Sequence, residues 1–147
     1  MNFIELKPLE REFQVDARAL ILQGLEEHWG WIDEQANPDI DDLMLAFSNG
    51  YFLTAWKANL LVGTGGIKFE RSGVLRIERM VVRKEFRRSG IGYQILDELV
   101  DFARRSTAEE VVLETTSSWK EAISSYNCYG FKIFAVDKDD THFELLL

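Results

Sequence analysis

The sequence has few of the residues that crosslink a chain or bind metals. Its 147 residues include one cysteine, two histidines and two prolines. A single cysteine, Cys128, cannot form an internal disulfide, which is typical of proteins in a reducing compartment. The two histidines, His28 and His142, show no metal-ligand spacing with other residues, so we expect no metal. These absences argue against a disulfide-stapled scaffold and a zinc module.

Long apolar runs and an excess of basic residues are also absent. No apolar run approaches the roughly 20 residues of a membrane span, and the first residues lack the basic-then-apolar pattern of a signal peptide. A formal net charge of -8 argues against nucleic acid as the main partner, because phosphate contacts need a basic surface. We therefore expect a cytoplasmic protein that binds neither a membrane nor nucleic acid.

What is present is an ordinary globular composition with one local reversal of charge. Apolar residues make up 46% of the chain and charged residues 29%, and the length suits one core, which predicts a single domain over 1–147. Basic residues concentrate just before Gly90, at Arg83, Lys84, Arg87 and Arg88. In an acidic chain, such a cluster indicates a small polyanionic ligand.

The spacing of apolar residues predicts strands that alternate with helices. The strands are predicted at 2–7, 51–56, 60–69, 74–82, 110–115, 131–136 and 142–147, and the helices at about 9–25, 40–47, 90–105 and 119–129. Segment 26–33 reads as a loop, and the glycines at 63, 65 and 66 mark a bulge or a close backbone approach. Because a helix separates strands 74–82 and 110–115, these two strands should be parallel.

A glycine corner connects strand 74–82 to the following helix, with the sequence Arg87-Arg88-Ser89-Gly90-Ile91-Gly92. The first amides of a helix have no intrahelical partner and lie at the positive end of its dipole. Gly90 and Gly92 carry no side chain that would keep a phosphate away from those amides. A Walker loop or a dinucleotide fingerprint would need residues that are absent here. The corner therefore predicts a diphosphate site of another kind.

Two motifs carry a resemblance to a known family. Arg-x-x-Gly-x-Gly after a β-branched strand resembles the acetyl-CoA loop of the GNAT superfamily of N-acetyltransferases, and Ala122–Phe131, which reads A-x-x-x-Y-x-x-x-G-F, resembles its last helix and following strand. The resemblance covers roughly the whole chain. It implies an α+β fold of the α/β-sandwich type: a mixed six- or seven-stranded sheet with helices on both faces and a central parallel pair that splays at the acetyl-CoA site.

The resemblance also implies the cofactor contacts, with acetyl-CoA as co-substrate. The backbone of the central strand would pair with pantetheine, and one of its amides could steady the oxyanion of the intermediate; these residues are Met80, Val81 and Val82. The corner would wrap the pyrophosphate mostly through backbone amides, at Arg87, Arg88, Ser89, Gly90, Ile91, Gly92 and Tyr93. Trp119 stands where many relatives place an asparagine that contacts CoA.

Two residues are candidates for proton transfer. Tyr126 matches the tyrosine that protonates the CoA sulfur in many relatives, and its alternative role is core packing. Strand alternation places Glu78 on one face with Met80 and Val82, from where it could take the amine proton, directly or through water. Some relatives carry this glutamate two residues earlier, at the position of Arg76, so Glu78 is equally well an ion-pair partner of a neighbouring arginine.

Segment 26–33 is the candidate acceptor wall, in which His28, Trp29 and Trp31 would meet the substrate. The acids beside His28 favour a cationic acceptor. Core packing of the aromatics and solvation of the acids is the alternative interpretation.

The leading hypothesis is an N-acetyltransferase that moves the acetyl group of acetyl-CoA to a primary amine, either a small cationic amine or a peptide amine, by direct attack in a ternary complex. A catalytically weak CoA-binding sensor or interaction module is the alternative, and a nucleotide phosphate-binder is a third. An apolar C-terminal strand with Phe143, Leu145, Leu146 and Leu147 could pair across a homodimer.

Overall fold

The computed structural model describes residues 3–31 and 33–147. In this part the chain forms seven strands: β1 Glu5–Pro8, β2 Tyr51–Lys57, β3 Leu60–Arg71, β4 Val74–Val82, β5 Glu110–Thr116, β6 Lys132–Val136 and β7 Asp140–Leu146. It also forms the α-helices α1 Gln14–Trp29, α2 Leu43–Ala46, α3 Ile91–Arg104 and α4 Lys120–Tyr129. Short 3-10 turns occur at Arg11–Phe13, Glu34–Ala36, Pro38–Asp42 and Lys84–Phe86.

The strands form one mixed sheet in the order β1-β2-β3-β4-β5-β7-β6. Consecutive strands from β1 to β4 pair antiparallel, and β7 pairs antiparallel with both β5 and β6. The β4–β5 pair is parallel, because α3 carries the chain back across the sheet between them. The predicted mixed sheet with a central parallel pair is confirmed.

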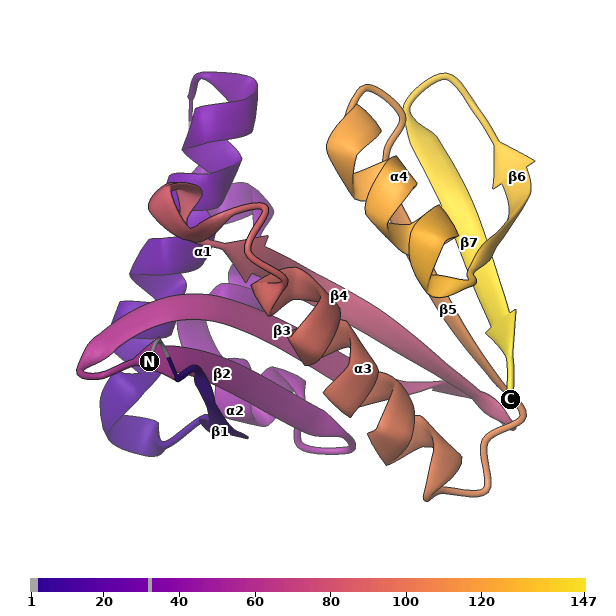
Figure 1. The fold of residues 1–147 in the computed structure, drawn as a ribbon, viewed down its shortest axis with the longest axis horizontal. Helices are drawn as coiled ribbons and strands as arrows, with labels where there is room; N and C mark the ends of the chain where they lie inside the picture. Colours follow the sequence, from indigo (N-terminus) through magenta and orange to yellow (C-terminus); the bar gives the residue numbers. More distant parts are fainter. Residues whose placement is uncertain (1–2, 32) are drawn as a thin grey trace.

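The parallel pair is short and then parts. Only Val74, Leu75 and Arg76 of β4 are in register with β5, opposite Glu110, Val111 and Val112. Beyond Arg76, β4 stays paired with β3 while β5 stays paired with β7. The two strands therefore diverge, as Figure 1 shows from their shared end near the C-terminus. The predicted splay is present.

Helices cover both faces of the sheet and create two apolar clusters. On one face, α3 buries the stripe Ile91, Ile95, Leu96, Leu99, Val100 and Ala103 against the sheet, together with Phe131 and Phe143. On the other face, α1 and α2 bury Leu20, Ile21, Leu43 and Phe47 against Phe52 and Trp56. Burial of these side chains is the main term that holds the layers together. Among the described helices, none has the length and apolarity needed to span a membrane.

The first helix is longer than the sequence pattern indicates. Residues 26–29, predicted as loop, form the last turn of α1, and Gly30 ends the helix in a left-handed conformation with φ 80°. Its amide donates to the carbonyl of Glu26, so Gly30 closes the helix as a C-terminal cap. The predicted helix 40–47 is in turn divided into the 3-10 turn Pro38–Asp42 and the single turn of α2.

The C-terminal strand lies inside the sheet. β7 pairs with β5 on one side and with β6 on the other, so β6 forms the edge at this end of the sheet and β1 the edge at the other. The expectation that the C-terminal strand pairs across a dimer is therefore wrong, because both of its edges already have partners.

Candidate functional site

A β-bulge changes the direction of β4 where it leaves β5. The register with β3 shifts between Thr64 and Gly66, and Arg79 adopts a left-handed backbone with φ 59°. Glu78 is paired with Gly66 across the two strands. A Cβ added at Gly66 would meet the ring of Phe47, which packs on the side of the sheet that α2 covers. These contacts place Glu78 on the face that α1 and α2 cover.

Met80 and Val82 lie on the other face, packed against the α3 cluster. The alternation that placed Glu78 beside them is therefore wrong, because the extra residue of the bulge reverses the direction of the following side chains. Val81 packs against the α1 cluster instead.

The end of β4 presents backbone groups to the space between the parted strands. The amide of Arg83 donates to the carbonyl of Val62 on β3 at 2.7 Å. Since backbone groups alternate along a strand, the amide and carbonyl of Val82 point the other way, toward the gap. The Nε of Arg87 donates to the carbonyl of Val82 at 2.9 Å. The amide of Val82 is therefore the group that remains directed toward the gap.

The glycine corner starts α3 with its first amides uncapped. Gly90 is the N-cap with φ 87°, and no side chain caps the helix. The first helical hydrogen bond runs from the amide of Gln94 to the carbonyl of Gly90, so the three amides at 91–93 have no intrahelical partner. The Ser89 hydroxyl donates to the carbonyl of Phe86, and no capping side chain accepts from these amides. The corner therefore offers a concave group of amide donors to an anion.

The arginines of the corner are held by acids of two helices. Arg87 forms an ion pair with Glu27 of α1 at 2.7 Å, and Arg88 forms one with Glu121 of α4 at 2.6 Å. Both guanidinium groups therefore already have acidic partners. The free amides, rather than these guanidinium groups, are what the corner presents at the start of α3.

Tyr126 lies on α4 in an apolar environment. It is half-buried, with ring centroids 6.1 Å from Phe131 and 5.5 Å from Phe143. Burial raises the pKa of Tyr126 to about 12. Within the described residues its hydroxyl has no hydrogen-bond partner. The group is therefore a protonated, uncommitted donor at neutral pH.

Glu78 has an ion-pair partner, although not an arginine. Its Oε1 lies 2.6 Å from Nζ of Lys68, without the alignment of a hydrogen bond, and is otherwise shielded from solvent. Arg76 pairs with Glu70 and Glu114 instead. A base at this position has to act in the presence of the lysine.

The last turn of α1 reaches across to the segment that follows β5. The ring of His28 lies 4.0 Å from that of Trp119, and its Nε2 is 3.5 Å from the hydroxyl of Ser118. Burial lowers the pKa of His28. Since Glu27 of the same turn pairs with Arg87, α1 contacts the segments after both parted strands.

Two hollows lie on either side of Trp29. The first, about 280 Å³, is lined by Trp29, Thr116, Ser118, Lys138, Asp139 and Asp140. The second, about 270 Å³, is lined by Leu25, Trp29, Trp31, Asp33, Ala36 and Asn37. Trp29 therefore lines both hollows and Trp31 lines the second, whereas His28 lines neither and contacts Trp29 and Ser118 of the first.

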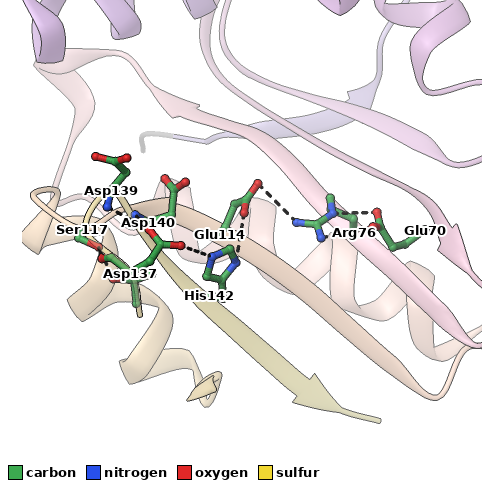
Figure 2. A network of polar contacts seen from close by, with 9 residues as sticks. Glu70, Arg76, Glu114, Ser117, Asp137, Asp139, Asp140 and His142 are labelled. Carbon is green, nitrogen blue, oxygen red and sulfur yellow. Dashed lines mark hydrogen bonds and ion pairs between the residues drawn. The ribbon is translucent and has the colours of Figure 1, made fainter. Parts of the chain in front are cut away.

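Sequence reasoning missed the polar network beside the first hollow. Figure 2 shows a chain of contacts from Glu70 through Arg76 and Glu114 to His142 and Asp137. The amides of Asp140 and Asp139 donate to Asp137 and, with His142, lower its pKa. The network fixes the turn that carries Asp139 and Asp140, whose carboxylates form no hydrogen bond or ion pair within the described residues. In the sequence, only the acidic residues of the hairpin turn 137–140 indicated this polar network.

No group of three or more potential metal ligands occurs among the described residues. A parted parallel pair beside an uncapped, glycine-started helix defines a fold that accepts a long anionic cofactor. Residues 16–131 match the Acetyltransferase (GNAT) family, and the chain belongs to this family. It is an acyltransferase that uses acetyl-CoA.

The relatives agree with this assignment. The uncharacterized N-acetyltransferase YvbK of Bacillus subtilis (strain 168) is 24% identical over 119 residues, which cover 74% of this chain and 77% of that protein. A GNAT acetyltransferase of Staphylococcus aureus Mu50 has the same fold, with a TM-score of 0.90, 20% identity, and coverage of 98% and 99%. The PaiA N-acetyltransferase of Thermoplasma acidophilum, solved in complex with coenzyme A, has a TM-score of 0.85, 18% identity, and 99% coverage of both chains. The predicted family and fold are confirmed.

Proposed function

We propose that residues 1–147 act as one domain that transfers the acetyl group of acetyl-CoA to a primary amine by direct attack in a ternary complex. The acceptor is a small cationic amine or a peptide amine. The observation that carries the proposal is that the uncapped amides at 91–93 follow β4, which parts from β5 beyond Arg76. A diphosphate bound at these amides and a pantetheine arm bound along the end of β4 would hold the thioester at a fixed place.

The cofactor contacts that we propose are mainly backbone contacts. The amides of Ile91, Gly92 and Tyr93 suit the pyrophosphate, with Arg87, Arg88, Ser89 and Gly90 forming the rest of the corner. Along β4 we assign the pantetheine to Met80, Val81 and Val82, and the gap-facing amide of Val82 supports this choice. Such an amide is also a suitable donor to the oxyanion of the tetrahedral intermediate.

The chemistry requires two proton movements. The amine nitrogen attacks the thioester carbonyl, a C–N bond forms, and the C–S bond breaks as the thiolate leaves. We assign protonation of the thiolate to Tyr126, because its raised pKa keeps the hydroxyl protonated at neutral pH. We assign acceptance of the amine proton to Glu78, through water, since it lies on the α1–α2 face and remains part-exposed. Lys68 would be its ion-pair partner during this step.

The acceptor is assigned to the hollows beside Trp29. The first hollow is lined by the indole of Trp29, by Asp139 and Asp140 and by one cation, Lys138; because the carboxylates outnumber the lysine, the hollow suits a group with positive charge. The ring of His28 lies 5.1 Å from that of Trp29, and Trp31 lines the second hollow. The direct test is to incubate the protein with acetyl-CoA and a panel of cationic and peptide amines while following free thiol. A lack of thiol release across the panel, with normal CoA binding, contradicts the proposal.

A CoA-binding sensor is the second candidate. Trp119 stands at the position of the asparagine that contacts CoA in many relatives, and Lys68 neutralises the proposed base. A sensor would bind CoA but show no acetyl-transfer rate, so substitution of Tyr126 would change no measurable rate. A homodimer remains a proposal, and its strand-pairing edge would be β6 rather than the C-terminal strand.

A further inference from the structure

Arg79 is held in an unusual backbone conformation at the centre of the site. Its φ of 59° is in the left-handed region, which non-glycine residues seldom adopt. Its carbonyl accepts a hydrogen bond of 2.8 Å from the hydroxyl of Thr64, a fully buried residue of β3. The backbone of Arg79 therefore fixes the bulge from which β4 continues into the gap.

The side chain of Arg79 makes a separate set of contacts. Its Nε donates to Asp39 at 2.9 Å and its Nη2 donates to the other oxygen of Asp39 at 2.7 Å. The same Nη2 donates to the Oδ1 of Asn37 at 3.0 Å. Only 18% of the arginine side chain and 25% of the aspartate side chain are exposed. A forked, partly desolvated pair of this kind fixes direction as well as distance.

One partner of the guanidinium, Asn37, lines the second hollow, and the other, Asp39, lies two residues further along the same segment. The Nδ2 of Asn37 donates to the carbonyl of Asp33, another lining residue, at 3.4 Å. Trp31 is on the same wall. Arg79 thus connects the strand that we assign to the thioester with the segment that we assign to the acceptor.

We propose that Arg79 is a positioning residue that sets the acceptor wall at 33–39 relative to the acetyl group held along β4. The inference rests on the proposed function, because it assigns the second hollow to the acceptor. The two halves of Arg79 act separately: its carbonyl orders the strand that binds the cofactor, and its guanidinium orders the wall. Loss of the guanidinium contacts therefore affects the acceptor and spares the cofactor.

The test uses two variants that remove the side-chain contacts and leave the bulge. Asp39→Asn removes the charged partner, and Arg79→Gly removes the guanidinium while glycine keeps the left-handed backbone without strain. The matched control is Asp41→Asn, which breaks the ion pair of Arg18 with the same 3-10 turn. For both test variants we expect the KM of the amine to rise about tenfold, with kcat and the Kd of CoA within about twofold of the wild type.

Thr64→Val completes the test from the backbone side. It removes the hydroxyl that holds the carbonyl of Arg79, so we expect CoA affinity to fall in this variant. Two results would overturn the proposal. One is that CoA affinity falls and the KM of the amine rises to the same extent in all three variants; the other is that the KM of the amine is unchanged in Asp39→Asn and Arg79→Gly.

Hydrogen exchange provides a readout that needs no turnover. Amides within 33–42 should exchange faster in Asp39→Asn and Arg79→Gly than in the wild type, while those of α3 stay unchanged. Unchanged exchange in this segment overturns the positioning role. An inactive wild type with the expected exchange pattern contradicts the proposed function and leaves the link between Arg79 and the wall intact.

Discussion

At the scale of single residues, Tyr126 and Tyr129 form a matched pair on α4. Burial raises the pKa of each to about 12, with Asp97 contributing at Tyr129. The hydroxyl of Tyr129 donates to Asp97 of α3 at 2.9 Å, whereas that of Tyr126 has no hydrogen-bond partner in the described part of the chain. The two phenols thus share a helix and a raised pKa, but the Tyr129 hydroxyl is already donating to Asp97, whereas the Tyr126 hydroxyl is free to donate to another group.

We expect Tyr126→Phe to lower kcat by about 10²–10⁴-fold, the usual contribution of a positioned general acid, with little change in CoA affinity. Tyr129→Phe should lower stability through the lost bond to Asp97 and leave kcat near the wild-type value. Because a pKa of about 12 keeps Tyr126 protonated, the ratio of wild-type to Tyr126→Phe rates should stay constant from about pH 6 to 9. Steady-state rates over pH measure this, and a ratio that falls in that range contradicts the assignment.

Above pH 10, the same pKa shift affects stability. The folded pKa is higher than the unfolded value, so stability contributed by Tyr126 is intact below pH 10 and is lost as pH rises toward 12. Tyr126→Phe should therefore show a shallower loss of stability than the wild type over this range.

Gly90→Ala tests the glycine corner. Gly90 has φ 87°, and an added Cβ would meet no atom within 4 Å, so the cost is conformational rather than steric, roughly 1–2 kcal/mol. Gly73→Ala is the control, since its φ of 78° is similar and it lies in the β3–β4 turn. Both variants should melt at lower temperature, but only Gly90→Ala should weaken CoA binding in calorimetry. An equal loss of CoA affinity in both would exclude a specific role for the corner.

Local sequence revealed the motif residues, because Gly90 and Tyr126 stand within short patterns with fixed spacing. It did not reveal the direction of Glu78. Strand alternation assumes one residue per pleat, and the bulge at Arg79 breaks it without a glycine at that position. The glycines on the facing strand indicated a bulge but could not locate the extra residue.

At the scale of elements, the turn of the β2–β3 hairpin contains a non-glycine residue in a strained backbone conformation. β2 ends at Lys57 and β3 starts at Leu60, which confirms the predicted tight connection. Ala58 occupies the left-handed region with φ 52°, whereas Asn59 does not have a positive φ. A β-carbon at Ala58 therefore carries a strain that glycine would relieve.

We expect Ala58→Gly to stabilise the protein by about 0.5–1 kcal/mol, the difference between strain relief and the added entropy of the unfolded chain. Asn59→Gly should give no gain, because that residue is not in the left-handed region. Thermal unfolding of both variants measures the difference. A gain from Asn59→Gly alone would mean that the turn conformation is wrongly assigned.

Element prediction failed where a helix end depends on context. The aromatic and acidic residues at 26–29 have no strong helix pattern, yet they extend α1 because Gly30 can close it and His28 and Trp29 gain partners near Trp119. These partners are about ninety residues away in sequence, so no local pattern contains them. The acceptor wall was therefore the least predictable part of the site.

At the scale of the whole molecule, the cofactor corner is a basic site on an acidic protein. The formal net charge is -8, and acids from α1 and α4 already pair with Arg87 and Arg88. Glu27 and Arg87 are partly buried, whereas 83% of the Arg88 side chain and 73% of the Glu121 side chain are exposed. The field of Glu27 is therefore less screened by solvent and salt.

We expect Glu27→Gln to tighten CoA binding about two- to fivefold at low salt, because it removes a negative charge beside the diphosphate site and releases Arg87. Glu121→Gln is the matched control, with a smaller gain because its ion pair is exposed. Calorimetry at about 0.05 M and 1 M salt checks this, since the gain should disappear when the screening length falls to about 3 Å. Weaker binding by Glu27→Gln at low salt would contradict the charge argument and mean that the ion pair with α1 holds the corner in its binding shape.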